Sequence, residues 1–192
     1  MKAYRLLEWQ SDAEVVDVEQ PEAGPGQVVV KIGAAGACHS DLHLMHDFVP
    51  GALPWGPPFT LGHENAGWVE QIGDGITGWS VGDPVAVYGP WGCGRCRRCR
   101  LGMENYCERS AEIGPAGGGL GLDGGMATHM LVPDARLLVP LEDLEPVEAA
   151  PLTDAGLTTY HAVARSLHRL VPGSHAVVIG IGGLGHMAVQ FL

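Results

Sequence analysis

The sequence lacks several features that would define other classes of protein. It has no apolar run near the roughly 18 residues that a membrane-spanning helix needs. Its first residues alternate like a strand and have no secretion-signal core, so a cytoplasmic location is expected. Lys and Arg number 11 against 22 Asp and Glu, and a net charge of −11 opposes nucleic acid or an anionic membrane as partner. These absences favour a small-molecule partner.

The first part of the chain is predicted to be rich in β-strands. Its 29 glycines indicate many turns and close backbone approaches. Short β-branched or alternating segments are separated by Gly and Pro, and they predict strands over 13–19, 27–32, 67–72, 83–88, 125–132 and 135–139. Strands at this spacing are typical of a barrel or a sandwich. The sequence therefore predicts a mainly β domain over residues 1–150.

The pattern changes near Pro146. A helix is predicted over 153–170, a short buried strand over 175–179, and a second helix over 186–192. Between that strand and helix lies a glycine loop, which we expect to bind a dinucleotide through Gly180, Gly182, Gly183, Leu184 and Gly185. Strand, glycine loop and helix are the opening of a Rossmann unit, although a simple Gly-rich turn is the alternative. Residues 151–192 are thus predicted to begin a second domain that is cut short at Leu192.

Four of the five cysteines form a cluster with the spacing C-x2-C-x2-C-x7-C, at Cys93, Cys96, Cys99 and Cys107. Four thiolates fill all the positions of a tetrahedral zinc ion, so the site is predicted to be structural, in a lobe over residues 91–110. Zinc with four thiolates has a net charge of −2, which the arginines of the loop can offset: Arg95, Arg97, Arg98 and Arg100.

Three alternatives to zinc at this cluster stay open. An iron–sulfur site is disfavoured because the bacterial ferredoxin pattern continues with a three-residue gap and Cys-Pro, whereas here the gap is seven and Glu108 follows. A nucleic-acid-binding zinc ribbon is disfavoured by the spacing and by the acidic charge. Free or randomly paired thiols are the third alternative.

A second group of metal-binding residue types precedes the cluster. Cys38 follows a predicted strand, and His63 and Glu64 lie in a short segment between Gly62 and Gly67. A single Cys or His is usually a packing or polar residue. Their occurrence with the cysteine cluster and the glycine loop, in this order, makes a chance arrangement improbable.

At this point the chain resembles the zinc-containing medium-chain alcohol dehydrogenases, especially bacterial enzymes acting on secondary alcohols and ketones. The pattern Gly62-His63-Glu64-x2-Gly67-x5-Gly73-x2-Ile76 matches that family's zinc signature, and 151–158 resemble the segment with its third catalytic ligand. The resemblance implies a GroES-like barrel followed by the start of a Rossmann domain. It also implies two zinc ions per chain, an alcohol or ketone substrate and a homo-oligomer in the full-length form. The residue that contacts the cofactor ribose and distinguishes NAD from NADP is expected beyond Leu192. Residues 1–192 therefore do not distinguish the two cofactors, and the resemblance favours NAD.

The resemblance implies a role for each matching residue. Cys38, His63 and Asp154 would hold the catalytic zinc, with Asp154 where many relatives have Cys; a helix N-cap is the alternative for Asp154. Glu64 would approach the metal from behind or act as a supporting carboxylate, and Asp41 would orient the ring of His63.

The remaining roles concern the proton, the cofactor and the substrate. Ser40 would take the proton of the alcohol, His43 would pass it to solvent, and His39 would lie near the pyrophosphate. Trp55 and Trp91 are candidates for the substrate pocket or for the core. A zinc domain without turnover and a zinc hydrolase are the alternative functions.

Overall fold

The computed structural model describes all 192 residues. Its larger sheet has five antiparallel strands in the order β10-β6-β5-β3-β9. Long β3 and β5 lie at its centre and carry the predicted β-branched residues. The strand bounds are β3 Val28–Gly36, β5 Glu64–Ile72, β6 Pro84–Val87, β9 His129–Val132 and β10 Leu138–Pro140. This arrangement confirms the prediction of a mainly β first domain.

A smaller sheet lies beside the first. It has the order β2-β1-β4 and is formed by Glu14–Asp17, Lys2–Leu6 and Phe59–Thr60. Backbone hydrogen bonds link the smaller sheet to the segment before β9, because Tyr4 N donates to Met126 O at 2.8 Å and Met126 N donates to Leu61 O at 2.9 Å. Two very short parallel strands, β7 (Gly117–Gly118) and β8 (Gly121–Leu122), complete the β structure.

The core consists of two main groups of buried apolar side chains. Val28, Val30, Val69 and Val85 face the interior of the larger sheet, since every second residue of a strand points to the same side. The second group, with Leu6, Leu44, Phe59 and Leu61, packs under α1 (His39–His46). Together they fix the end of β3 and the start of α1 relative to β5.

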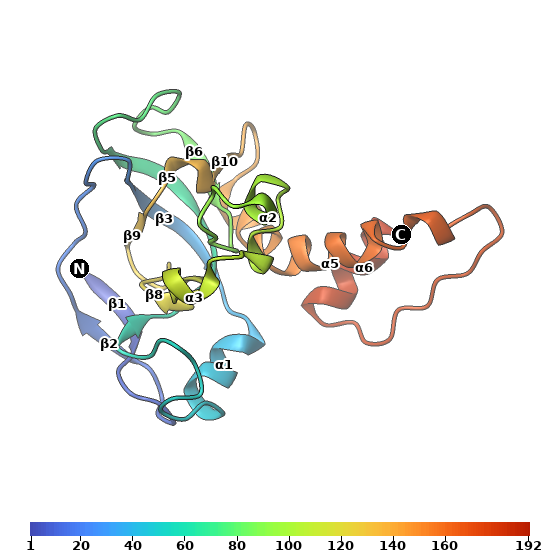
Figure 1. Cartoon of the computed structure of the whole chain (residues 1–192), viewed down its shortest axis with the longest axis horizontal. Coiled ribbons are helices and arrows are strands. Elements are labelled where there is room, and N and C mark those ends of the chain that lie inside the picture. Colours follow the sequence, from blue (N-terminus) through green and yellow to red (C-terminus); the bar gives the residue numbers. More distant parts are fainter.

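The other helices are short and lie mainly after or around the cysteine lobe. They are α2 Arg97–Arg100, α3 Ser110–Ile113, α4 Pro146–Ala149, α5 Ala155–Ala164 and α6 Gly183–Phe191, with 3-10 turns η1 Glu104–Tyr106, η2 Ala135–Leu137, η3 Ala150–Thr153 and η4 Leu167–Arg169. Figure 1 shows that α5, α6 and the segment between them extend to one side of the β structure. None of the helices is both long and apolar enough to cross a lipid bilayer.

The predicted strand over 175–179 is wrong, because this segment is extended but joins no sheet. Val177 is 82% exposed and Ile179 is 96% exposed. A parallel strand needs at least one neighbouring strand and cover on both faces, and residues 175–179 have neither here. α6 starts at Gly183, earlier than predicted, directly in the glycine loop.

Other element bounds also differ from the predictions. The helix predicted to reach residue 170 ends at Ala164 and is followed by a 3-10 turn. Strand pairing predicted from 125 begins only at His129. Residues 135–137 form a 3-10 turn because the Asp134 carboxylate accepts the backbone N–H of Arg136, so the strand starts at Leu138. β5 begins at Glu64, which places that carboxylate on a buried strand.

Candidate functional site

Three residues far apart in the sequence meet at one point, here called the three-ligand site: Cys38, His63 and Asp154. Cys38 is the residue before α1, His63 precedes β5, and Asp154 lies between η3 and α5. Their ligand atoms all lie within 4.8 Å of one another. Asp154 Oδ2 is 3.6 Å from Cys38 Sγ and 3.4 Å from His63 Nε2. A thiolate, an imidazole and a carboxylate at this separation suit a zinc ion with one position left open.

The ring of His63 is held between two carboxylates. Its Nε2 faces Asp154, and its Nδ1 lies 3.4 Å from Asp41 Oδ1. Asp41 is fixed in turn, because its Oδ2 accepts the backbone N–H of Cys38 at 2.9 Å. Burial lowers the pKa of His63, but Asp154 and Asp41 outweigh it and raise that pKa to about 11. Such a strong preference for positive charge fits a site that holds a cation.

Asp154 occupies the position of a helix N-cap but does not act as one. Its side chain makes no capping hydrogen bond to the backbone of α5. Its Oδ1 accepts a hydrogen bond from Thr158 Oγ1 at 3.0 Å, while Oδ2 faces Cys38 and His63. The contact with His63 lowers the pKa of Asp154, so the carboxylate stays charged. The N-cap alternative therefore does not account for this side chain.

Glu64 is buried directly behind the three-ligand site. Its Oε1 accepts the backbone N–H of Ala155 at 3.3 Å, which links β5 to the residue after Asp154. Burial, followed by the charge of Asp154, raises the pKa of Glu64. A Cβ at Gly36 would stand only 2.0 Å from Glu64 Oε2, so the carboxylate fills a space that only glycine leaves open. The space at Gly36 and the hydrogen bond from Ala155 thus fix the position of the Glu64 carboxylate. Its approach to a metal stays a prediction.

The residues predicted to carry protons lie along α1. Ser40 Oγ is 3.6 Å from Cys38 Sγ. His39 and His43 are exposed, and their rings meet edge to face with centroids 4.8 Å apart. His43 also pairs with Asp47. The helix thus places Ser40 at the site and two histidines between it and solvent.

A largely apolar cavity of ≈310 Å³ opens beside the three-ligand site. His63 and Asp154 lie at one wall, and Trp91, Leu120 and Leu157 contribute apolar surface. Glu104, Asn105 and Ser110 of or next to the cysteine lobe also line it. Trp91 therefore lies where a substrate-pocket residue is expected.

Trp55 lies elsewhere. Its ring packs against Phe59 at a centroid distance of 5.8 Å and against Trp9 at 6.2 Å. Trp55 does not line the cavity beside the three-ligand site. It belongs instead to the aromatic packing next to α1.

A second hollow connects the three-ligand site with the glycine loop. Its walls carry Cys38, His39 and Ser40 on one side and Gly180 and residues 182–187 on the other. Gly180 has a φ of 92°, which favours glycine, and a Cβ at Gly185 would stand 1.9 Å from Gly180 O. The structure thus brings the predicted cofactor residues to the metal-binding residues.

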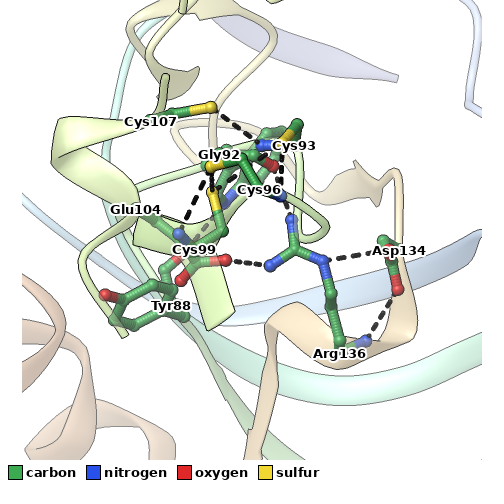
Figure 2. Close-up of polar contacts among 10 residues, drawn as sticks. Tyr88, Gly92, Cys93, Cys96, Cys99, Glu104, Cys107, Asp134 and Arg136 are labelled. Atoms are coloured by element: carbon green, nitrogen blue, oxygen red, sulfur yellow. Dashed lines mark hydrogen bonds and ion pairs between the residues drawn. The ribbon is translucent and has the colours of Figure 1, made fainter. Parts of the chain in front are cut away.

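The four cysteines of the cluster also converge, with all sulfur atoms within 4.8 Å of one another. Cys99 Sγ is 3.4 Å from Cys96 Sγ and 3.9 Å from Cys93 Sγ. Zinc–sulfur bonds of about 2.3 Å in a tetrahedron require sulfurs about 3.8 Å apart, so these separations fit zinc. Figure 2 shows the four side chains turned toward a common centre.

Backbone hydrogen bonds and burial shift the pKa values of the cluster thiols in opposite directions. The N–H groups of Cys96, Cys99 and Arg109 donate to Cys93, Cys96 and Cys107 sulfurs at 3.3 to 3.4 Å. A hydrogen bond from the Arg95 backbone is the main cause that lowers the pKa of Cys93 to about 6, whereas burial and nearby thiols raise that of Cys99 to about 12. Burial and the neighbouring thiols thus oppose a thiolate at Cys99, and a bound cation would compensate its charge.

A positive charge that was not predicted also reaches the cysteine lobe. Arg95, Arg97, Arg98 and Arg100 are all exposed and form no ion pair. Arg136 instead reaches the lobe from η2, where it pairs with Glu104 and donates to Gly92 O at 2.6 Å. Sequence reasoning missed Arg136 because it lies well beyond the cysteines along the chain and belongs to no motif.

Comparison with known proteins agrees with this geometry. The model of the alcohol dehydrogenase GroES-like domain family matches residues 24–143. A NAD-dependent alcohol dehydrogenase of Sulfurisphaera tokodaii is 43% identical over 99% of this chain and 54% of its own length. The chain thus spans about half the length of the curated relatives it matches.

Two solved structures show the same likeness in three dimensions. The alcohol dehydrogenase of Aeropyrum pernix has a TM-score of 0.88 and 39% identity, covering 99% of this chain and 55% of its own. A cobalt- and zinc-bound alcohol dehydrogenase of Pyrobaculum aerophilum has a TM-score of 0.82 and 33% identity, covering 98% of this chain and 56% of its own. The chain belongs to the zinc-dependent medium-chain alcohol dehydrogenase family. Its β structure is the GroES-like domain of that family.

Proposed function

We propose that this chain carries the catalytic zinc and substrate site of an alcohol dehydrogenase that oxidises alcohols, mainly secondary ones, and reduces the matching ketones. One observation supports this most directly. Cys38, His63 and Asp154 meet between a cavity with apolar walls and the glycine loop. An apolar cavity accommodates the carbon substituents of an alcohol, and the loop accommodates a dinucleotide.

The proposal divides the chain into two domains. Residues 1–150 form the catalytic domain, with the cysteine lobe at 91–110 as its structural zinc site. Residues 151–192 open a NAD-binding Rossmann domain, supported by the glycine loop and the start of α6. NAD is preferred over NADP because the relative from Sulfurisphaera tokodaii is named a NAD-dependent enzyme. As a complete enzyme we propose a homo-oligomer with two zinc ions per subunit.

The residues of the site have separate tasks. Cys38, His63 and Asp154 would hold the catalytic zinc, which when bound makes an alcohol hydroxyl easier to deprotonate. Asp41 holds the ring of His63 so that Nε2 faces the metal position.

Other residues would transfer the proton and bind the cofactor. Ser40 is placed to accept the proton beside Cys38, and His43, one turn further along α1, to release it to solvent. His39 and the glycine loop line the hollow where the dinucleotide would bind.

The test replaces zinc by Co²⁺ in the full 192-residue chain and follows its visible absorption. Addition of a secondary alcohol such as 2-butanol should change the spectrum saturably, because only the three-ligand site has an open position. Asp154→Ala should abolish this response, while Asp143→Ala, which removes an exposed carboxylate elsewhere, should not. A spectrum indifferent to alcohol would contradict the proposal. Rapid hydrolysis of p-nitrophenyl acetate without an alcohol response would favour a zinc hydrolase.

A further inference from the structure

The guanidinium of Arg136 contacts the cysteine lobe at two places, one beside the first cysteine of the cluster and one beside the last. Its Nη2 donates to Gly92 O at 2.6 Å, and its Nη1 pairs with the Glu104 carboxylate. Gly92 directly precedes Cys93, and Glu104 O accepts the backbone N–H of Cys107 at 3.0 Å. Arg136 therefore holds the chain next to the first and the last cysteine, which Figure 2 shows in contact through the hydrogen bond from Cys93 N to Cys107 Sγ.

Arg136 itself is anchored to the β structure and not to the lobe. Its Nε pairs with Asp134 at 3.1 Å, and Asp134 also caps η2. The next residue, Leu137, is buried in the core, and its carbonyl accepts the backbone N–H of Tyr88 at 2.8 Å. The side chain is thus a brace between a rigid part of the domain and a lobe made of turns.

Arg136 also compensates the negative charge of Glu104 beside the cluster. The Glu104 side chain is only 9% exposed, and it lies beside four sulfurs that carry negative charge when they bind a metal. A buried carboxylate without a cation would oppose that state. Arg136 compensates Glu104, and its planar guanidinium presents separate N–H groups to the carboxylate and the carbonyl in a fixed geometry, whereas lysine has one small ammonium on a flexible stem. A Cβ at Gly94 would stand 2.6 Å from Arg136 Nε, so the loop passes close over the guanidinium.

We propose that Arg136 is the positioning residue of the structural zinc site. It sets the separation of Cys93 and Cys107 and neutralises the Glu104 carboxylate beside them, a contact that no other arginine of the chain makes. Residues that support metal ligands in this way typically change metal affinity about 10- to 100-fold when they are removed. The inference concerns metal retention in the lobe and does not depend on alcohol oxidation.

The test measures zinc release to a chromophoric chelator from the zinc-loaded 192-residue chain. Cys107→Ser identifies which kinetic phase belongs to the four-cysteine cluster. Arg136→Gln should release cluster zinc about 10- to 100-fold faster and leave the other phase unchanged. The matched control Arg97→Gln removes an exposed arginine of the lobe and should release zinc at the wild-type rate. Arg136→Lys keeps the charge without the planar fork and should be intermediate.

The absorption of Co²⁺ in the cluster gives a readout that simple loss of stability would not move. In Arg136→Lys, which is the variant expected to fold, the thiolate–cobalt bands should shift because the ligands are no longer held in the same geometry. Wild-type release and spectra in both Arg136 variants would overturn the proposal. Equal acceleration by Arg97→Gln would overturn it too, by showing a general charge effect. A wild-type chain with no metal in the cluster would refute both the site and its brace.

Discussion

Replacement of Gly36 by alanine should damage the domain through Glu64 and not through the backbone. The added Cβ would stand 2.0 Å from Glu64 Oε2, 2.9 Å from Glu64 Cβ and 3.0 Å from Cδ. The buried carboxylate can move away only by giving up its hydrogen bond from Ala155 N. Overpacking typically costs about 1–3 kcal/mol, and loss of a hydrogen bond to a charged group costs about 1.5–3 kcal/mol. The two costs do not add in full, because moving the carboxylate relieves the clash. We therefore expect the free energy of unfolding to fall by about 2–3 kcal/mol.

Urea denaturation of the zinc-loaded chain at fixed free zinc measures this loss. The Gly182→Ala control adds a Cβ where no atom lies within 4 Å, at a φ of −81°, and should change the midpoint little. Glu64→Ala removes the carboxylate but keeps the contact with its Cβ at 2.9 Å, so Gly36→Ala should cost less in that background than in the wild type, about 1 kcal/mol. A midpoint unchanged by Gly36→Ala, or the same cost with and without the Glu64 carboxylate, would refute the reasoning.

Three further predictions concern the metals and the chain as a whole. Elemental analysis of the fully loaded chain should find two zinc atoms, and one or none would contradict the two-site interpretation, while iron would revive the iron–sulfur alternative. Cys107→Ser should lose one zinc and unfold at a lower temperature while the three-ligand site keeps its metal, so unchanged thermal stability would show that the cluster is not structural. The 192-residue chain should retain both metals yet show no NAD-dependent oxidation of 2-butanol. The reason is that residues 175–179 have no neighbouring strands with which to form a complete dinucleotide site. Measurable turnover would disprove this.

Residues that carry a local motif were predicted well from the sequence. The spacing of the four cysteines leaves few ways to arrange them, because two-residue gaps return neighbouring sulfurs to the same side of a tight turn. The approach of Cys38, His63 and Asp154 has no local signal and came from the family resemblance; the structure brings the three together. Their roles in catalysis stay predictions.

The features that were missed depend on neighbours that are distant along the chain. The strand over 175–179 has the right composition, but composition cannot supply pairing partners. Arg136 looked like any surface arginine, whereas four arginines inside the cysteine loop looked like its counter-charge. The four arginines are exposed, because long side chains next to a cluster in sequence can still point to solvent, and their role as counter-charge stays a prediction.

The two metal sites differ greatly in how much chain their ligands enclose. The first and last cysteines of the cluster are 14 residues apart, whereas Cys38 and Asp154 are 116 apart. Closing the longer loop costs about 2 kcal/mol more in chain entropy, and it also requires both sheets to be in place. The cluster can therefore begin to bind its ion within its own lobe, before Arg136 of the β structure holds that lobe in place. The three-ligand site can be filled only after the domain has folded, so metal uptake there reports completed folding.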